Sequence, residues 1–125
     1  MSDDHAIFRR VLWTSAVFNV GGALLFAYPA SLGQLVGLPA DVPGIYRAFV
    51  ALFVLLFGGS YAWLAAQPTI DRAFVGFAAI GKSSAFALIA IFWLAGRIPG
   101  LGVIAGAGDL VFAAIFAGWL ARGAR

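Results

Sequence analysis

The chain has 125 residues, of which 63% are apolar and 10% charged, with a formal net charge of +3. Soluble domains average about 45–50% apolar and about 25% charged residues, so this composition excludes a soluble globular domain. The Lys and Arg residues stand singly or in pairs rather than on one basic face, which argues against a nucleic-acid partner.

Four apolar stretches each approach the roughly 20 residues that a helix needs to cross hydrocarbon. They cover approximately residues 11–28, 46–66, 73–95 and 101–120. The links at residues 67–71 and 96–100 have about five residues each, and links this short force antiparallel neighbours. The sequence predicts an all-α fold: a four-span antiparallel transmembrane helix bundle that forms a single transmembrane domain over residues 1–125.

The link between the first two predicted spans is longer and partly apolar. Residues 29–39 begin and end with Pro and carry apolar residues at roughly helical spacing, namely Leu32, Leu35, Val36 and Leu38. This pattern fits a short helix lying in the membrane interface, and it fits an irregular loop equally well. Before the third span, Asp71 and Arg72 are expected to cap and orient the helix that follows.

The tetrapeptide Arg-Ala-Phe-Val occurs twice, at residues 47–50 and 72–75, where it opens spans of opposite direction. It could be the trace of an inverted repeat of the kind that some transporters have. An Arg followed by small and apolar residues is also a common way to begin a span. We favour this second interpretation.

The arginines are unevenly distributed between the two ends of the predicted spans. With an even number of spans, one side of the membrane carries both termini and the link between the second and third spans, and it holds Arg9, Arg10, Arg72, Arg122 and Arg125. The opposite side holds only Arg47 and Arg97. By the positive-inside rule, both termini are predicted to be cytoplasmic in a multi-pass protein.

All four tryptophans fall near the ends of predicted spans, where an indole ring can be buried while its N–H stays wet. Trp13, Trp63 and Trp119 lie on the predicted cytoplasmic side and Trp93 on the other. We interpret them as interfacial anchors. Arg47 is interpreted in the same way, as a side chain that snorkels to the lipid headgroups; a pair with Asp41 or with a lipid phosphate is the alternative.

Two charged residues lie deep within predicted spans, where a charge costs at least about 2.5–3.5 kcal/mol. Lys82 is near the centre of the third span and Asp109 near the centre of the fourth. Because these helices are predicted to be antiparallel and joined by a short link, the two side chains reach nearly the same depth and can meet. Asn19, near the centre of the first span, and the hydroxyls of Ser83 and Ser84 complete the candidate ligand or ion-relay residues.

Three interpretations of the Lys82 and Asp109 pair remain open. The first is a structural ion pair that fixes helix register and hides two costly groups from lipid. The second is a proton or ion relay, in which Asp109 titrates and Lys82 tunes it. The third is catalysis or cofactor attachment on the Lys82 amine. The sequence contains no second acid at this depth, so we identify no catalytic residue and favour a non-enzymatic protein.

Small residues accompany these polar positions. The fourth span contains Gly102 and Gly106 at the GxxxG spacing, and the second span contains Gly58 and Gly59. Small residues four apart let two membrane helices approach closely. The pattern agrees with an inward-facing Asp109.

Several short motifs resemble small bacterial DoxX-like four-helix membrane proteins. They are the run Tyr-Pro-Ala-Ser-Leu at residues 28–32 with Leu35, Gly37 and Leu38, then Tyr46-Arg47 opening a span that contains Gly58-Gly59, and the segment Gly108-Asp109-Leu110. The resemblance implies the bacterial inner membrane and an accessory or binding role. It transfers no catalytic residue.

Together these features predict a non-enzymatic integral membrane protein, an accessory or ligand- or partner-binding subunit with a buried Lys-Asp contact. The alternative is a small proton-linked transporter or channel that uses Asp109 and Lys82. The partners expected are membrane lipid, a second copy of the chain or a larger membrane complex, and a lipophilic small molecule.

Overall fold

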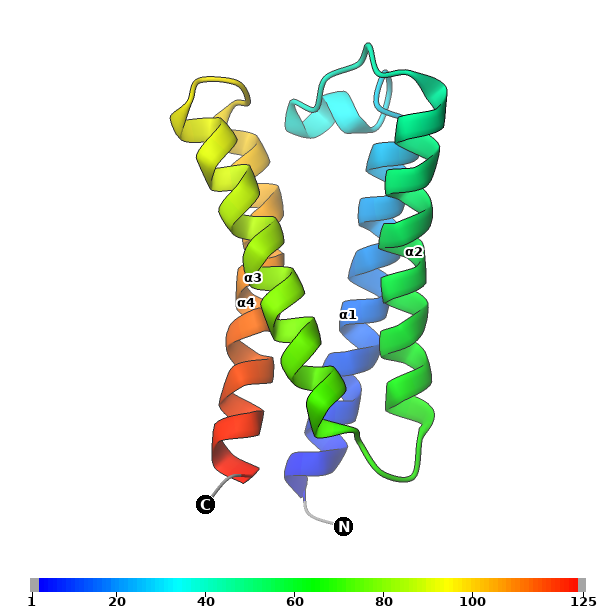
Figure 1. The fold of residues 1–125 in the computed structure, drawn as a ribbon, viewed down its shortest axis with the longest axis vertical. Helices are drawn as coiled ribbons and strands as arrows, with labels where there is room; N and C mark the ends of the chain where they lie inside the picture. Colours follow the sequence, from blue (N-terminus) through cyan, green and yellow to red (C-terminus); the bar gives the residue numbers. More distant parts are fainter. Residues whose placement is uncertain (1–2, 124–125) are drawn as a thin grey trace. The chain divides into compact units, whose positions relative to one another are not determined.

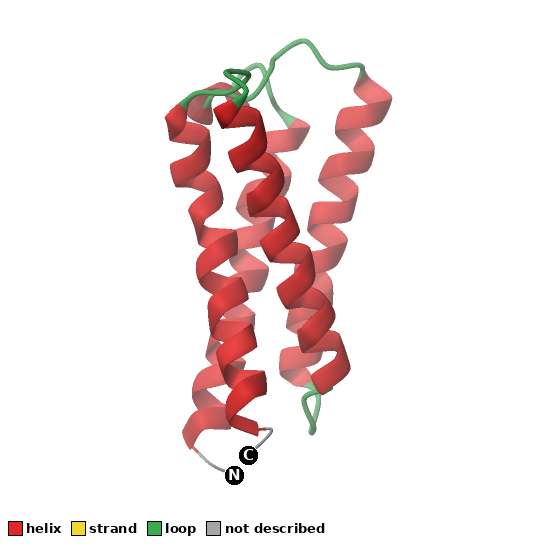
Figure 2. Cartoon of the chain, turned by 60° about the vertical axis from the view of Figure 1, so that its left-hand side comes forward, coloured by secondary structure: helices red, strands yellow, loops and turns green. Residues whose placement is uncertain are grey.

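The computed structural model describes residues 3–123, and Arg125, which contributes to the predicted charge bias, lies outside this range. In chain order the elements are α1 (Asp3–Ala27), the short 3₁₀ helix η1 (Gly33–Val36), α2 (Gly44–Ala66), α3 (Arg72–Leu94) and α4 (Gly100–Gly123). Figure 1 shows the four long helices in sequence colours, and Figure 2 shows that the described part of the chain contains helices and loops without strands. The all-α prediction with four long helices is confirmed.

All four long helices are long and apolar enough to cross a membrane. The shortest, α2 and α3, have 23 residues each. At about 1.5 Å per residue such a helix is about 34 Å long, and a bilayer core is about 30 Å thick. The chain is therefore a multi-pass membrane protein whose helices contact lipid. α1 extends from Asp3, because polar turns precede the apolar span predicted at residues 11–28 and continue its helix.

Packing between helices divides the chain into two compact units, residues up to Pro68 and residues from Thr69 onward. The single transmembrane domain expected over residues 1–125 stays a prediction. In the first unit α1 packs antiparallel against α2 (Figure 1). Gly58 lies in this contact. A Cβ atom at Gly58 would lie 2.8 Å from the Cβ of Asn19 and 3.2 Å from the carbonyl oxygen of Ala16. The small residue is thus what allows α1 and α2 to approach.

The link between α1 and α2 combines a short helical turn with irregular loop, the two structures that the sequence allowed. Its centre is a single 3₁₀ turn, Gly33–Val36, and the segments on either side are irregular. The turn ends at Gly37, whose φ of 80° is left-handed and favours glycine. Leu35 remains exposed at 67%. An exposed apolar turn beside the end of a membrane helix is consistent with a position in the interface.

The second unit is an antiparallel pair, α3 against α4, joined by a tight turn at residues 95–99 (Figure 1). Asp71 caps α3, because its Oδ1 accepts a hydrogen bond of 3.1 Å from the backbone N–H of Phe74. This confirms the capping predicted for Asp71. The buried face of α4 carries small residues and aromatic rings, which are Gly102, Gly106, Phe112, Ala113, Phe116 and Trp119.

Candidate functional site

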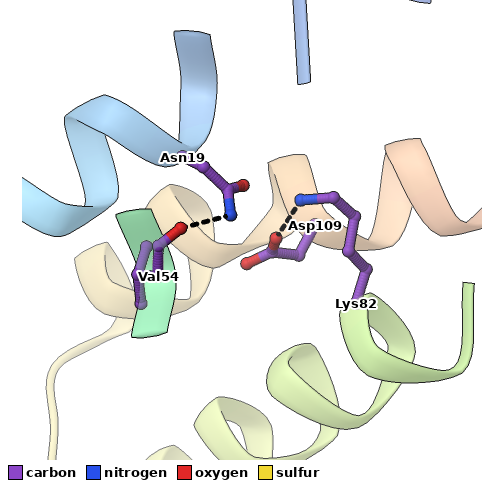
Figure 3. A network of polar contacts seen from close by, with 4 residues as sticks. All are labelled: Asn19, Val54, Lys82 and Asp109. Carbon is purple, nitrogen blue, oxygen red and sulfur yellow. Dashed lines mark hydrogen bonds and ion pairs between the residues drawn. The ribbon is translucent and has the colours of Figure 1, made fainter. Parts of the chain in front are cut away.

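A buried ion pair joins the two helices of the second unit. The Nζ of Lys82 donates a hydrogen bond to the Oδ1 of Asp109 across 2.9 Å (Figure 3). The side chain of Lys82 is 3% exposed and that of Asp109 is 20% exposed. The contact predicted between these two residues is confirmed.

Helix geometry explains why these two residues meet. Lys82 lies in the middle third of α3 and Asp109 in the middle third of α4. The tight turn at residues 95–99 fixes the relative register of the two antiparallel helices, so both side chains project into the contact at similar depth. The four-carbon stem of lysine covers the remaining offset along the helix axis.

An aromatic ring also lies close to the ammonium group of Lys82. The Nζ of Lys82 lies 5.3 Å from the centre of the Phe112 ring. Phe112 follows Asp109 by three residues on α4, so the carboxylate and the ring occupy one face of the helix. A cation close to an aromatic face is stabilised by the ring quadrupole, and this effect is stronger away from water. α4 therefore offers the lysine both a counter-ion and a π face.

Asp109 keeps one carboxylate oxygen free. Its Oδ1 accepts from Lys82, whereas its Oδ2 has no hydrogen-bond partner within residues 3–123. This oxygen belongs to a partly exposed side chain, so it can accept a hydrogen bond or a proton from outside the pair.

The predicted site residue Asn19 makes a hydrogen bond within the first unit. Its Nδ2 donates to the backbone carbonyl oxygen of Val54 at 3.0 Å, and its side chain is 7% exposed (Figure 3). A helical carbonyl that accepts a second hydrogen bond from a neighbouring helix ties the two helices together. Asn19 thus connects α1 to α2, as Lys82 connects α3 to α4.

The two serines next to Lys82 in sequence do not join its ion pair. Both Ser83 and Ser84 are exposed. The Oγ of Ser84 donates to the carbonyl oxygen of Ile80 at 2.7 Å, one turn earlier on the same helix. Successive residues of a helix point about 100° apart, so residues adjacent to a buried lysine face elsewhere.

The predicted interfacial anchors differ in exposure. Trp13, Trp63 and Trp93 are 49%, 73% and 45% exposed, and Arg47 is exposed as well. Trp119 is only 7% exposed, and the guanidinium carbon of Arg72 lies 5.5 Å from its ring centre. The role of all five residues as membrane anchors stays a prediction.

Sequence reasoning missed that two arginines bind the ends of neighbouring helices. Arg9 on α1 donates to the carbonyl oxygens of Ala65 at 2.6 Å, Gln67 at 2.5 Å and Pro68 at 2.9 Å, where α2 ends. Arg72 donates to the carbonyl oxygen of Leu120 at 2.8 Å, near the end of α4. The last carbonyls of a helix lack intrahelical partners and carry the negative end of its dipole, so a cation there is stabilising. A clue in the sequence was that each arginine lies near the start of a helix whose antiparallel partner ends on the same side.

Ser15 is a second feature that the sequence did not reveal. Its side chain is fully buried, and its Oγ has no hydrogen-bond partner among the described residues. A buried hydroxyl without a partner is uncommon. It lies on α1 one turn before Asn19, so α1 presents two polar side chains on its buried face.

The described residues contain no group of three or more His, Cys, Asp or Glu side chains that could hold a metal ion. The chain matches no protein-family model, no curated protein and no solved structure. What the fold and site define is thus a class: a multi-pass helical membrane protein with a buried lysine–aspartate ion pair between two of its spans.

Proposed function

We propose that this chain is a non-enzymatic, DoxX-like membrane protein of the bacterial inner membrane that serves as an accessory or partner-binding subunit. In this proposal both termini are cytoplasmic, and the Lys82–Asp109 pair is internal structure. The observation that carries the proposal is the ion pair of 2.9 Å, in which the almost fully buried ammonium group of Lys82 binds the carboxylate of Asp109 on the neighbouring helix.

The geometry of the pair favours a structural role over amine chemistry. An amine that acts as a nucleophile must offer a free lone pair. The Lys82 nitrogen instead donates to Asp109 and lies over the Phe112 ring, and both contacts stabilise the charged ammonium form. Each charge alone would be costly in lipid, whereas the pair is neutral as a whole.

The outer faces of the helices support a role in binding lipid or another membrane protein. Large apolar side chains stand exposed on all four long helices, including Val17 at 71%, Trp63 at 73%, Leu94 at 76% and Ile104 at 71%. In a bilayer these faces contact acyl chains or the helices of another subunit. A second copy of the chain, a larger complex and a lipophilic small molecule are the partners that such faces suit.

The experiment compares the tagged full-length chain with Lys82→Met, Asp109→Leu and the double variant, each extracted in mild detergent. Each single variant leaves one uncompensated charge, which costs about 3–5 kcal/mol when buried, so both are expected to lose folded protein. The double variant removes both charges and is expected to keep the native particle size and the native copurifying partner or lipid. A double variant that folds but loses that partner would show that the pair belongs to the binding site and would contradict this proposal.

A second candidate, a small proton-linked transporter or channel, is favoured by the free Oδ2 of Asp109 and the 20% exposure of its side chain. It is tested by proton flux into liposomes that contain the purified chain and an entrapped pH-sensitive dye. Asp109→Asn should abolish the flux, whereas Asp41→Asn, a matched change in an exposed link, should leave it intact. Flux that survives Asp109→Asn would exclude this candidate.

A further inference from the structure

The two arginine contacts have the same design. In the first unit an arginine near the start of the first helix binds the Ala65 carbonyl near the end of the second helix. In the second unit Arg72 binds the Leu120 carbonyl in the same way. The two arginines are 63 positions apart, and the two accepting carbonyls are 55 positions apart. These two offsets align α1 with α3 and α2 with α4.

The same offsets also align the two deep polar contacts. Ten residues after its arginine, α1 carries Asn19 and α3 carries Lys82. Eleven residues before its accepting carbonyl, α2 carries Val54 and α4 carries Asp109. Asn19 binds Val54, and Lys82 binds Asp109. The arginines alone fix the alignment of α1 with α3, so the match of Asn19 with Lys82 is an independent agreement. Arg9 also binds the carbonyls of Gln67 and Pro68, and of its three acceptors Ala65 is the one whose offset brings Val54 onto Asp109.

Buried positions follow the same alignment. On the first helices, Leu12 and Ser15 correspond to Val75 and Ala78, and all four are at most 2% exposed. On the second helices three further pairs are buried in both units, namely Gly58 with Ala113, Tyr61 with Phe116, and Leu64 with Trp119.

From these agreements we propose that the chain consists of two copies of one helical hairpin, α1–α2 and α3–α4, arranged in tandem. The difference between the two offsets falls at the hairpin tip. The tip spans residues 28–43 with η1 in the first copy and residues 95–99 in the second. Exposed loops are where insertions are best tolerated, so a longer tip changes neither contact.

The repeated tetrapeptide of the sequence does not mark this repeat. Residues 47–50 open the second helix of the first hairpin, whereas residues 72–75 open the first helix of the second. Arg72 binds a helix end, whereas Arg47 is exposed and makes no hydrogen bond or ion pair to the described part of the chain. The two copies are tandem, so the tetrapeptide is not the trace of an inverted repeat.

In this repeat the Asn19–Val54 and Lys82–Asp109 contacts occupy equivalent positions and hold the two helices of each hairpin together. The first contact is neutral and the second is charged. A hairpin of this design therefore does not need an ion pair to close. The chemistry of one copy should function in the other, provided that it is placed at the equivalent positions. This consequence is independent of the function proposed above.

The first test transfers the neutral contact into the second hairpin of the full-length chain. Lys82→Asn/Asp109→Val supplies an amide that can donate to the backbone carbonyl at position 109. The control, Lys82→Leu/Asp109→Val, lacks that donor. We expect the first variant to keep an unfolding midpoint about 2–8 °C above that of the control, the shift that one interhelical hydrogen bond gives in a chain of this size. Equal midpoints would contradict the repeat.

The second test transfers the charged contact into the first hairpin and checks its register. Asn19→Lys alone buries an unpaired charge and should lower the yield of folded protein. Val54→Asp, the equivalent of Asp109, should restore that yield, whereas Ala51→Asp, one turn away on α2, should not. Failure of Val54→Asp to restore the yield, or equal rescue from position 51, would overturn the proposed equivalence whatever the function of the protein.

Discussion

Lys82 or Asp109 alone would place an unpaired charge in the membrane at a high free-energy cost, and their pairing lowers this cost. A single charge at the centre of a membrane helix costs at least about 2.5–3.5 kcal/mol, and a buried pair recovers much of this only when its geometry is good. Here the nitrogen and oxygen atoms are 2.9 Å apart, and Phe112 covers the ammonium. The pair therefore fixes the register of α3 against α4 without leaving a net charge in lipid.

Gly58 is a residue of the α1–α2 contact at which a single added methyl group should destabilise the chain. Its added Cβ would meet the root of Asn19 and the backbone oxygen of Ala16, and neither can move aside. Gly58→Ala is therefore expected to destabilise the chain by about 1–3 kcal/mol, the usual cost of overpacking. Circular dichroism of thermal unfolding in detergent measures the effect.

The next residue supplies the control for this change. A Cβ at Gly59 would meet nothing within 4 Å, so Gly59→Ala should change stability by no more than about 0.5 kcal/mol. At Gly106 the clash is with the tip of the flexible Ile89 side chain, so Gly106→Ala should cost less than Gly58→Ala. If all three variants unfold alike, the close approach at Gly58 is not what holds α1 on α2.

For single residues, the sequence predicted which side chains meet better than it predicted which way each side chain faces. The meeting of Lys82 and Asp109 could be predicted, because antiparallel helices with one deep charge each leave few other arrangements. The outward orientation of Ser83 and the burial of Trp119 could not be predicted, because both depend on helix rotation. A rotation of a few tens of degrees moves a side chain from one face to another, and periodicity in a uniformly apolar helix does not define it.

At the scale of elements, α2 and α4 each end on an arginine from the neighbouring helix. Arg9 makes three hydrogen bonds to carbonyls at the end of α2, and Arg72 makes one near the end of α4. These contacts satisfy groups that would otherwise lack partners at the membrane surface. They fix each hairpin at the end opposite its tip.

Arg9→Gln should destabilise the chain by about 1.5–3 kcal/mol, the usual effect of losing hydrogen bonds to a charged group. Arg10→Gln is the matched control, because it removes the same charge from the same segment while Arg10 is exposed. It should change stability by less than about 0.5 kcal/mol. Chemical unfolding of both purified variants measures the difference, and equal losses would mean that charge rather than capping is responsible.

The existence and order of the four long helices could be predicted because apolar length is a strong signal. The 3₁₀ turn at Gly33–Val36 was harder to predict. A four-residue turn is too short for periodicity to separate a helix from a loop.

At the scale of the whole molecule, the proposed topology places both termini in the cytoplasm. The chain contains no cysteine, so single cysteines can be introduced and labelled without a background. In spheroplasts, Asp41→Cys should react with a membrane-impermeant maleimide, whereas Thr69→Cys should react only after permeabilisation. Both positions are exposed, so a difference in labelling reports sidedness. The reverse pattern would invert the topology.

Composition and span length were enough to define a multi-pass membrane protein, but they do not specify its partner. An apolar face that contacts lipid resembles one that contacts another subunit, because neither presents a pattern of donors and acceptors. The two proposed functions differ in whether the Lys82–Asp109 pair keeps its charges or exchanges a proton.

The most direct test is infrared difference spectroscopy of the Asp109 carboxylate in lipid across a range of pH, with Asp109→Asn used to assign the band. If the pair is static, the carboxylate stays ionised throughout the neutral range in the native chain. It becomes protonated there only in the fraction of Lys82→Met that still folds. A carboxylate that titrates near neutral pH in the native chain would contradict the structural role and identify Asp109 as a proton carrier.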